Sequence, residues 1–421
     1  MTSEAPNPEA VTRDMDRHNS WVFAISHLLI YFASPVVYVG IVQAALCDKL
    51  GASAAVANLP NSAYFLGFFF PVILSWTLAY RFERTVVVAA NLVTSSSLVL
   101  VALSLFLPVA DSIRLGIVIG QGLVLGLADS SSIVYMYQCL KRGTSLKGRA
   151  RCLKWTFAFT PILAVVGNLL AQFILGGGIP ALSHPKDFGL LYLMAAGCTG
   201  GVAFLATRFR LVDIAEKKPP FAETMKTTFR SYLQGRTLFL IWIAYLFLFL
   251  AWNSTTNLSL YSREALGADP KDYAGYMNAL RFGFKAVTGF ALGVIMIRWG
   301  IRAPLVTTVL LTAAGILWAW VVPGHAFLMA FAFMGGGELA GAYFPNYVIS
   351  VSAAAAAARN NAFLSLVLPV SSFAPALHGA LADAFGFPAS FGFGLAMAAL
   401  SLTLVLCLPK QAETIAAKSH D

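Results

Sequence analysis

Long apolar runs recur along this chain, and they constrain its fold more than any other feature. A helix needs about 20 apolar residues to cross the hydrocarbon core of a membrane. Strands of a membrane barrel would be about ten residues long and would alternate polar and apolar positions, which these runs do not. The sequence therefore predicts an all-α, polytopic membrane protein with twelve transmembrane helices, at residues 21–46, 54–80, 86–107, 115–139, 153–175, 188–207, 237–260, 273–297, 303–322, 326–351, 361–382 and 388–408.

The composition excludes several other classes of protein. Only 11% of the residues are charged and 58% are hydrophobic, whereas soluble domains are about 25% charged. The net charge of +10 would suit nucleic acid. However, the basic residues sit at the predicted membrane boundaries, so the expected partner is the lipid bilayer and not nucleic acid. The five cysteines are scattered singly, without disulfide or metal spacing, so we expect no metal and no cofactor.

The distribution of Lys and Arg indicates how the chain is oriented. Positive residues favour cytoplasmic segments, and an N-terminus inside the cell places most of the 29 basic residues there. We therefore expect both termini to be cytoplasmic, in a membrane such as the bacterial inner membrane. The expected segments are a tail at 1–20, a six-helix half at 21–207, a central cytoplasmic loop at 208–236, a second half at 237–408 and a tail at 409–421.

The two halves repeat each other in sequence. Arg81-Phe82-x-Arg84 follows the second run, and Arg298-Trp299-x-x-Arg302 follows the eighth. The stretches RCLKWTFAFTP, from Arg151, and RNNAFLSLVLP, from Arg359, each lead from Arg to Pro over ten residues. Repeated halves with a substrate site near the midplane are a transporter architecture. The sequence therefore predicts two pseudo-symmetric halves of six helices.

Residues 21–408 resemble the major facilitator superfamily of secondary transporters. The resemblance rests on the twelve spans, the long central loop, the Gly-rich IGQGLVLGLA in the fourth span and the family motif G-x-x-x-D-R-x-G-R-[RK]. Both copies of that motif lack its aspartate, which is Tyr80 in the first copy and Ile297 in the second. The resemblance implies transport without catalysis, so we expect no enzyme activity. It also implies gating roles for Arg81, Glu83, Arg84, Arg298 and Arg302.

Four ionisable residues lie deep inside the predicted spans: Asp129, Arg281, Lys285 and Glu338. At 1.5 Å per residue, all four fall near the membrane midplane, where charged groups tend to mark substrate or ion pathways. Arg281 and Lys285 share one helical face, and a single carboxylate cannot fully neutralise both. A substrate carboxylate or phosphate would supply the missing charge, and Glu338 or Asp129 would carry a coupled proton. The alternative is an ion-pair network that only locks the helices together.

Other polar side chains complete the predicted site, because the resemblance implies that spans one, four, seven and ten line the cavity. The run Gly335-Gly336-Gly337 precedes Glu338 and is expected to act as a hinge or to permit close backbone approach. With Arg281 and Lys285, the expected substrate-binding residues are Tyr31, Tyr38, Gln121, Tyr135, Trp252, Asn253, Asn278, Tyr343 and Asn346.

The sequence thus favours a proton-coupled secondary transporter, a symporter, that moves a small organic anion by alternating access and functions as a monomer. No GxxxxGK[ST] motif occurs, which argues against direct use of ATP. One alternative is a carrier of neutral polar solutes, such as sugars or nucleosides, or a drug-type exporter, with the charges paired internally. A membrane sensor or scaffold that transports nothing is the other alternative.

Overall fold

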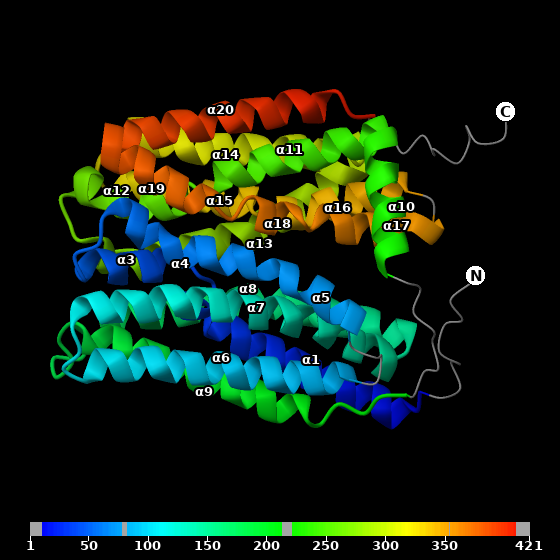
Figure 1. The fold of residues 1–421 in the computed structure, drawn as a ribbon, viewed down its shortest axis with the longest axis horizontal. Helices are drawn as coiled ribbons and strands as arrows, with labels where there is room; N and C mark the ends of the chain where they lie inside the picture. The colour runs from blue at the N-terminus through cyan, green and yellow to red at the C-terminus, as the bar shows by residue number, and fades with distance from the viewer. Residues whose placement is uncertain (1–10, 78–81, 213–220, 353, 410–421) are drawn as a thin grey trace.

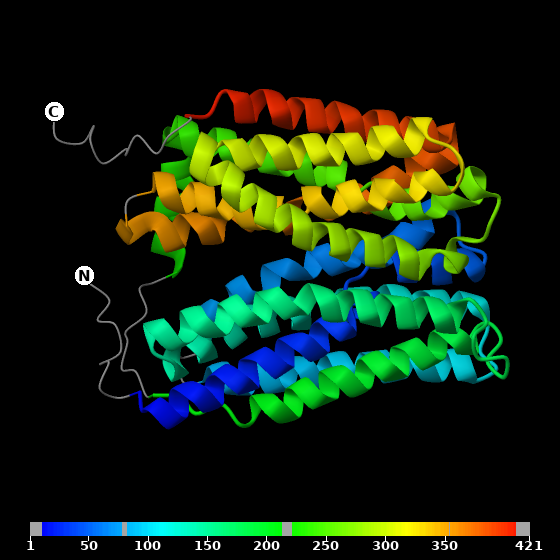
Figure 2. The same cartoon turned by 180° about the vertical axis from the view of Figure 1, so that it is seen from behind.

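Long helices run side by side along the molecule and form two groups, α1–α9 and α11–α20 (Figure 1, Figure 2). The structure, a computed structural model, describes residues 11–77, 82–212, 221–352 and 354–409. Eleven of its helical segments are long and apolar enough to cross a membrane. The first predicted span runs the same length of the bundle in three pieces (Figure 1). The all-α class and the two six-helix halves are confirmed.

The first half begins with a helix that is longer than the sequence suggested. Thr12 caps α1 by accepting a hydrogen bond from the Met15 amide at 3.2 Å, and two aspartates in the first turn suit the helix dipole. The expected tail at 1–20 is therefore helical from Arg13 onwards. The half consists of α1 (Arg13–Phe32), α2 (Ser34–Val37), α3 (Ile41–Lys49), α4 (Ala54–Leu66), η2 (Gly67–Phe69), α5 (Phe70–Thr77), α6 (Glu83–Phe106), α7 (Asp111–Gly143), α8 (Leu146–Leu175) and α9 (Lys186–Ala206).

The second half begins with a short helix, α10 (Phe221–Gln234), that lies across one end of the bundle (Figure 1). Tyr232 is buried and donates to the Asn360 carbonyl at 2.6 Å, whereas Phe229 and Leu233 are exposed. The other elements are α11 (Arg236–Trp252), α12 (Thr255–Leu266), η4 (Pro270–Asp272), α13 (Ala274–Trp299), α14 (Ala303–Val321), η5 (Gly324–Leu328), α15 (Met329–Gly337), α16 (Ala340–Val351), α17 (Ala354–Leu364), α18 (Val367–Val370), α19 (Ala374–Phe385) and α20 (Phe387–Leu406).

Several runs that the sequence predicted as continuous helices are interrupted in mid-span. The first run breaks at Ala33 and again at residues 38–40, the seventh at 253–254, and the tenth at 338–339. Gly40 has φ +150°, a conformation open to glycine. The side chain of Gln43 bridges this break, because it bonds the Gly40 amide at 3.0 Å and the Val36 carbonyl at 2.5 Å. The length of an apolar run indicates a segment buried in the membrane, but it does not show where the helix breaks within that segment.

Glycines set the closest helix contacts in both halves. A Cβ on Gly126 of α7 would lie 2.0 Å from the Tyr64 carbonyl oxygen of α4. A Cβ on Gly335 of α15 would lie 2.0 Å from the Arg281 carbonyl oxygen of α13. The close backbone approach expected at residues 335–337 is therefore confirmed, while their role as a hinge stays a prediction. These contacts bring α4 against α7, and α13 against α15, at the level of the charged residues.

Ion pairs join the halves at the end of the bundle opposite α10, here called the far end. Arg263 pairs with Asp48 at 2.5 Å, Lys271 pairs with Asp187 at 3.2 Å, and Lys49 pairs with Asp269. Helices α4 and α19, α8 and α13, and α3 and α12 also pack together across the halves. The start of α1 and the end of α20 lie at the opposite end of the bundle, the end that carries α10 (Figure 1).

The carboxylate of Asp383 adds a further bond between the halves at the far end. Asp383 lies in the last turn of α19, in the second half. Its carboxylate accepts hydrogen bonds from the Ala54 and Ala55 amides of the first half, at 2.9 and 2.8 Å. Those amides open α4, whose own N-cap residue, Ser53, makes no side-chain cap bond. One half therefore caps a helix of the other.

Candidate functional site

The centre of the site is an ionic triad in the second half. Arg281 Nε lies 2.9 Å from Glu338 Oε2, and Lys285 Nζ lies 2.9 Å from Glu338 Oε1. The cations are one turn apart on α13, and Glu338 occupies the break between α15 and α16. The close contact at Gly335 holds these elements together. With two cations and one carboxylate, the triad carries a formal charge of +1.

The triad faces the interior of the bundle. Val287, Phe290 and Ile297 are 67, 81 and 83% exposed and mark the outward face of α13. At 3.6 residues per turn, Lys285 lies on roughly the opposite face of the helix. Its side chain is 21% exposed and that of Glu338 16%, against 5% for Arg281. The accessible parts of Lys285 and Glu338 are therefore turned away from lipid, as expected of groups on a transport pathway.

Aromatic rings from both halves surround the cations. The guanidinium carbon of Arg281 lies 5.1 Å from the ring centre of Trp252, a cation–π distance. The Phe282 ring lies 5.2 Å from Tyr38 and 6.2 Å from Tyr31, and the two tyrosines lie 5.5 Å apart. The first span thus places Tyr31 and Tyr38 beside Phe282, while their role in substrate binding stays a prediction. Phe282 was missed, although it directly follows Arg281.

Several predicted residues have buried polar side-chain atoms without a hydrogen-bond partner among the described residues. These atoms are the amide groups of Gln121, Asn253 and Asn278 and the indole nitrogen of Trp252. A buried polar group without a partner costs about 1–3 kcal/mol, so such groups suit contact with a ligand or with water. Asn278 lies three residues before Arg281, on the same face of α13, and is the best placed of them. Tyr135 is buried on α7.

Asp129 lies apart from the triad. Its Oδ2 accepts a hydrogen bond from the Tyr64 hydroxyl at 2.9 Å, and within the described part of the chain it forms no ion pair. The contact at Gly126 brings Tyr64 to it. Tyr64 was missed, because a single tyrosine in an apolar run gives no signal. Tyr38 is close enough to both Asp129 and Glu338 for their charges to act on its hydroxyl.

Two further predicted residues lie on α16, nearer the α10 end. The Tyr343 hydroxyl reaches the Gly289 carbonyl at 3.5 Å, one turn beyond Lys285. Asn346 contacts Met296 Sδ at 3.5 Å, about 16 Å along α13 from Lys285. The structure therefore leaves Tyr343 beside the triad and Asn346 away from it.

The residues expected to act in gating contact groups of their own half. Glu83 pairs with the buried Arg142 at 2.5 Å, and Arg84 donates to the Phe209 carbonyl at 3.2 Å. Arg302 donates to the carbonyls of Leu406 and Leu408, both at 2.8 Å, and Arg298 is exposed. Arg81 lies outside the described residues. The gating roles stay predictions. Arg142 was missed, since it is one of several basic residues after the fourth run.

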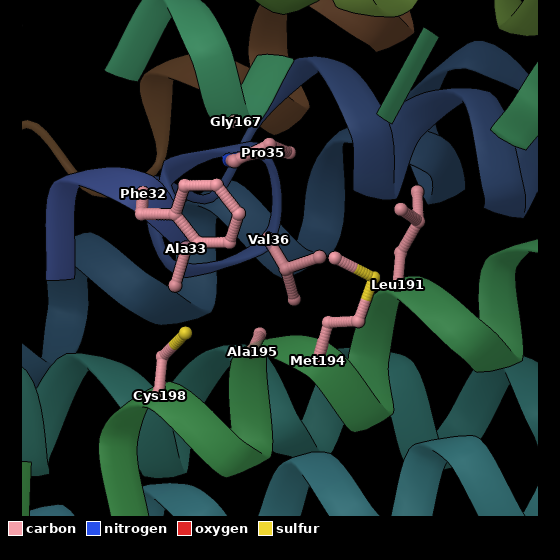
Figure 3. Close-up of a pocket in the computed structure, with 9 residues that line it drawn as sticks. All are labelled: Phe32, Ala33, Pro35, Val36, Gly167, Leu191, Met194, Ala195 and Cys198. Atoms are coloured by element: carbon pink, nitrogen blue, oxygen red, sulfur yellow. The ribbon is translucent and has the colours of Figure 1, made fainter. Parts of the chain in front are cut away.

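The structure also contains a small apolar pocket, in the first half, beside the break at Ala33 (Figure 3). The side chains of Phe32, Val36 and Met194 point into it in the close-up. No charged side chain lines it, so it does not suit an ionic ligand. Its lining is Phe32, Ala33, Pro35, Val36, Gly167, Leu191, Met194, Ala195 and Cys198. No group of three or more His, Cys, Asp or Glu side chains that could hold a metal occurs within the described ranges.

Comparison with solved structures shows which fold this is. A point mutant of the nucleoside transporter NupG superposes with a TM-score of 0.70 at 10% identity, covering 92% of this chain and 98% of that one. A D-xylose–proton symporter gives 0.67 at 14% identity, covering 95% and 99%. A bacterial homologue of the human lysosomal transporter Spinster, inward-facing and unoccupied, gives 0.64 at 13% identity, covering 94% and 96%. No protein-family model and no curated protein sequence matches the chain.

Proposed function

Because the chain has the fold of major facilitator transporters, we propose that it is a secondary transporter that moves a small organic anion by alternating access. One observation carries the proposal: two cations in mid-bundle share a single carboxylate, and their accessible side faces the interior. The unbalanced positive charge would attract a carboxylate or a phosphate. Such a charge is costly within a membrane unless something pairs with it.

In this proposal the substrate anion binds at the accessible side of the triad. Lys285, the more exposed cation, would meet the anion first and exchange part of its bond to Glu338 for one to the cargo. Arg281 would hold the second oxygen, because a guanidinium can donate two parallel hydrogen bonds to one carboxylate. The amide of Asn278 and the ring of Trp252 would contact the rest of the substrate.

A carrier of neutral polar solutes is the second candidate, and one observation favours it. Glu338 already pairs with both cations, as expected if the charges only stabilise the bundle. The buried amides of Gln121, Asn253 and Asn278 would then bind hydroxyl groups of the solute. If substrate binding persists in a variant that lacks Arg281, the protein is a carrier of neutral solutes or a drug-type exporter and not an anion carrier. Counterflow of labelled substrate excludes a sensor or scaffold that transports nothing.

We also propose that the α10 end is cytoplasmic and that the far end faces outwards, in the bacterial inner membrane. The Lys and Arg distribution supports this orientation. The contacts between the halves at the far end then make this conformation one that is closed to the outside. We further propose that the transporter is a monomer driven by protons.

Thermal shift and counterflow experiments test the anion proposal. Purified protein is screened against organic acids, sugars, nucleosides and drug-like amphiphiles. Anions should stabilise the wild-type protein, and Arg281→Ala or Lys285→Ala should weaken their binding about 10- to 150-fold, because a hydrogen bond to a charged group contributes about 1.5–3 kcal/mol.

Lys147→Ala is the matched control, since it removes an exposed lysine of α8 that lies far along the chain from the triad. It should bind anions like the wild type. Stabilisation by neutral solutes alone, or anion binding that survives both triad substitutions, would overturn the anion proposal.

A further inference from the structure

Asp129 differs from Glu338 in every described contact that decides its charge. Glu338 receives two ion pairs at 2.9 Å, whereas Asp129 receives one hydrogen bond from the neutral hydroxyl of Tyr64 at 2.9 Å. Asp129 is 9% exposed on α7, so little water is available to stabilise its charge. A buried carboxylate without a cation favours its neutral form. The sequence had treated the two acids as equivalent candidates for carrying a proton.

The charge of Arg281 reaches the Tyr64 hydroxyl, but Arg281 is already paired with Glu338 at 2.9 Å, and among the described residues no cation pairs with Asp129. From α4 it meets Tyr64, and from the break between α2 and α3 it meets the electrostatic influence of Tyr38. From α6, Asn91 reaches the neighbouring Ser132 at 2.7 Å instead. The Ser130 hydroxyl donates to the Gly126 carbonyl of its own helix at 2.6 Å. Each of these hydroxyl and amide groups is neutral, and Glu338, the next carboxylate, is already paired.

The triad alone carries a formal charge of +1, and with Asp129 ionised the charges of the whole site sum to zero when no substrate is present. Arg281 and Lys285 contribute +2, and Glu338 and Asp129 contribute −2. Arrival of a monoanion changes this sum to −1 in a region of low dielectric, where unbalanced charge is expensive. One proton restores neutrality. If the proton bound Glu338, Arg281 and Lys285 would lose the carboxylate that they share. If it bound Asp129, no ion pair would break.

We propose that Asp129 takes up the coupled proton while Glu338 stays ionised, so that one monoanion moves with one proton and no net charge. The proposal rests on the anion transport proposed above. The proton would bind Oδ1, because Oδ2 accepts the Tyr64 hydroxyl, and it would leave when the site opens to the other side. Tyr64 acts as a positioning residue that holds the carboxyl in place.

Infrared difference spectroscopy tests the proton site without any substrate. Protein in detergent is titrated with acid, and the C=O stretch of a protonated buried carboxyl is followed. Asp129→Asn should remove this band, Glu338→Gln should leave it, and Tyr64→Phe should shift its frequency by removing the hydrogen bond. Asp111→Asn, at an exposed helix end, is the control and should leave the band unchanged. A band that Glu338→Gln removes and Asp129→Asn keeps would overturn the assignment.

Transport in proteoliposomes tests the coupling, with labelled gluconate, a hydrophilic carboxylate that does not cross lipid unaided, as the monoanion probe and protein-free liposomes as the blank. A pH gradient should drive about tenfold accumulation per pH unit in the wild type, and an imposed voltage should not alter it. Asp129→Asn should keep counterflow but lose accumulation, and its uptake should respond to voltage. Accumulation that persists in Asp129→Asn sinks the coupling proposal. If the wild type exchanges no gluconate, anion transport fails for this probe, and the infrared result still tests the assignment of the proton to Asp129.

Discussion

Replacing Asp383 with asparagine should loosen the far end of the bundle without touching the ionic triad. Asp383 accepts two amides at the start of α4 from the other half. A helix cap contributes about 1 kcal/mol, and a negative charge near a helix N-terminus adds about 0.3–1 kcal/mol. Because Asp383 is exposed, solvent screens part of the charge, and asparagine still offers one acceptor. We expect a loss of about 1 kcal/mol, which is about a fivefold shift towards far-end opening.

Distances between spin labels measure this shift. Labels on Ala181 and Ala326, which are exposed and lie in different halves at the far end, report its opening. The background replaces Cys198 and Cys407 with serine, because the other three cysteines are buried. Asp383→Asn should raise the long-distance population about fivefold relative to the parent.

The matched control for this experiment is Asp111→Asn. Asp111 is also an exposed aspartate of a far-end helix terminus, but its partner, Arg114, lies 2.7 Å away within the same half. Its substitution should not change the distance distribution. Equal populations in Asp383→Asn and the parent, or equal changes in both variants, would refute the idea that capping between the halves holds the far end closed.

Three further changes probe other parts of the structure. Gly126→Ala should lower stability by about 1–3 kcal/mol in thermal unfolding, because its Cβ would clash with a backbone carbonyl of α4. Gly120→Ala, which has open space around it, should leave stability unchanged. Equal effects of the two substitutions would contradict the packing argument. Glu83→Gln should cost about 1.5–3 kcal/mol, because it removes the charge from the short hydrogen bond between Glu83 and the buried Arg142, and an unchanged melting temperature would contradict this. Burial raises the pKa of the Asp48 carboxyl above its usual range, although an arginine opposes this shift. Closure of the far end therefore disfavours the charged form of Asp48. The closed conformation should become more stable as the pH falls through the raised pKa, and less stable as the pH rises above it. Asp48→Asn should flatten that pH dependence in the spin-label assay.

The sequence predicted the architecture well because long apolar stretches, basic loops and repeated Arg motifs each reflect the membrane directly. It also predicted the close packing at residues 335–337, whereas the helix α10 lies within the segment that the sequence predicted as a loop at 208–236. The breaks at residues 38–40 and 253–254 escaped it, since apolar length is blind to local backbone geometry. The sequence identified Arg281, Lys285 and Glu338 by their depth, and the structure joins them.

Depth alone could not separate the two acids. Asp129 lies 22 residues before Arg151 and Glu338 lies 21 residues before Arg359, so the two acids occupy nearly matching places in the repeat and the pattern treated them alike. Their different partners depend on which helices the glycines bring together, and that is decided by packing between segments far apart in the chain. Tyr64 was missed for the same reason, because its role arises only from the approach of α4 to α7 at Gly126.

The triad belongs entirely to the second half, on α13 and the break between α15 and α16. If the halves rock against each other as rigid bodies, Arg281, Lys285 and Glu338 stay on one rigid body throughout the cycle, and only their side chains rearrange around the cargo. The second half then holds the charged groups that bind the anion throughout the cycle, whereas Tyr31 and Tyr38, on the first half, move towards and away from them. The first half would cover a binding surface that stays in place on the second half. A cargo could then stay bound while the site closes on one side of the membrane and opens on the other.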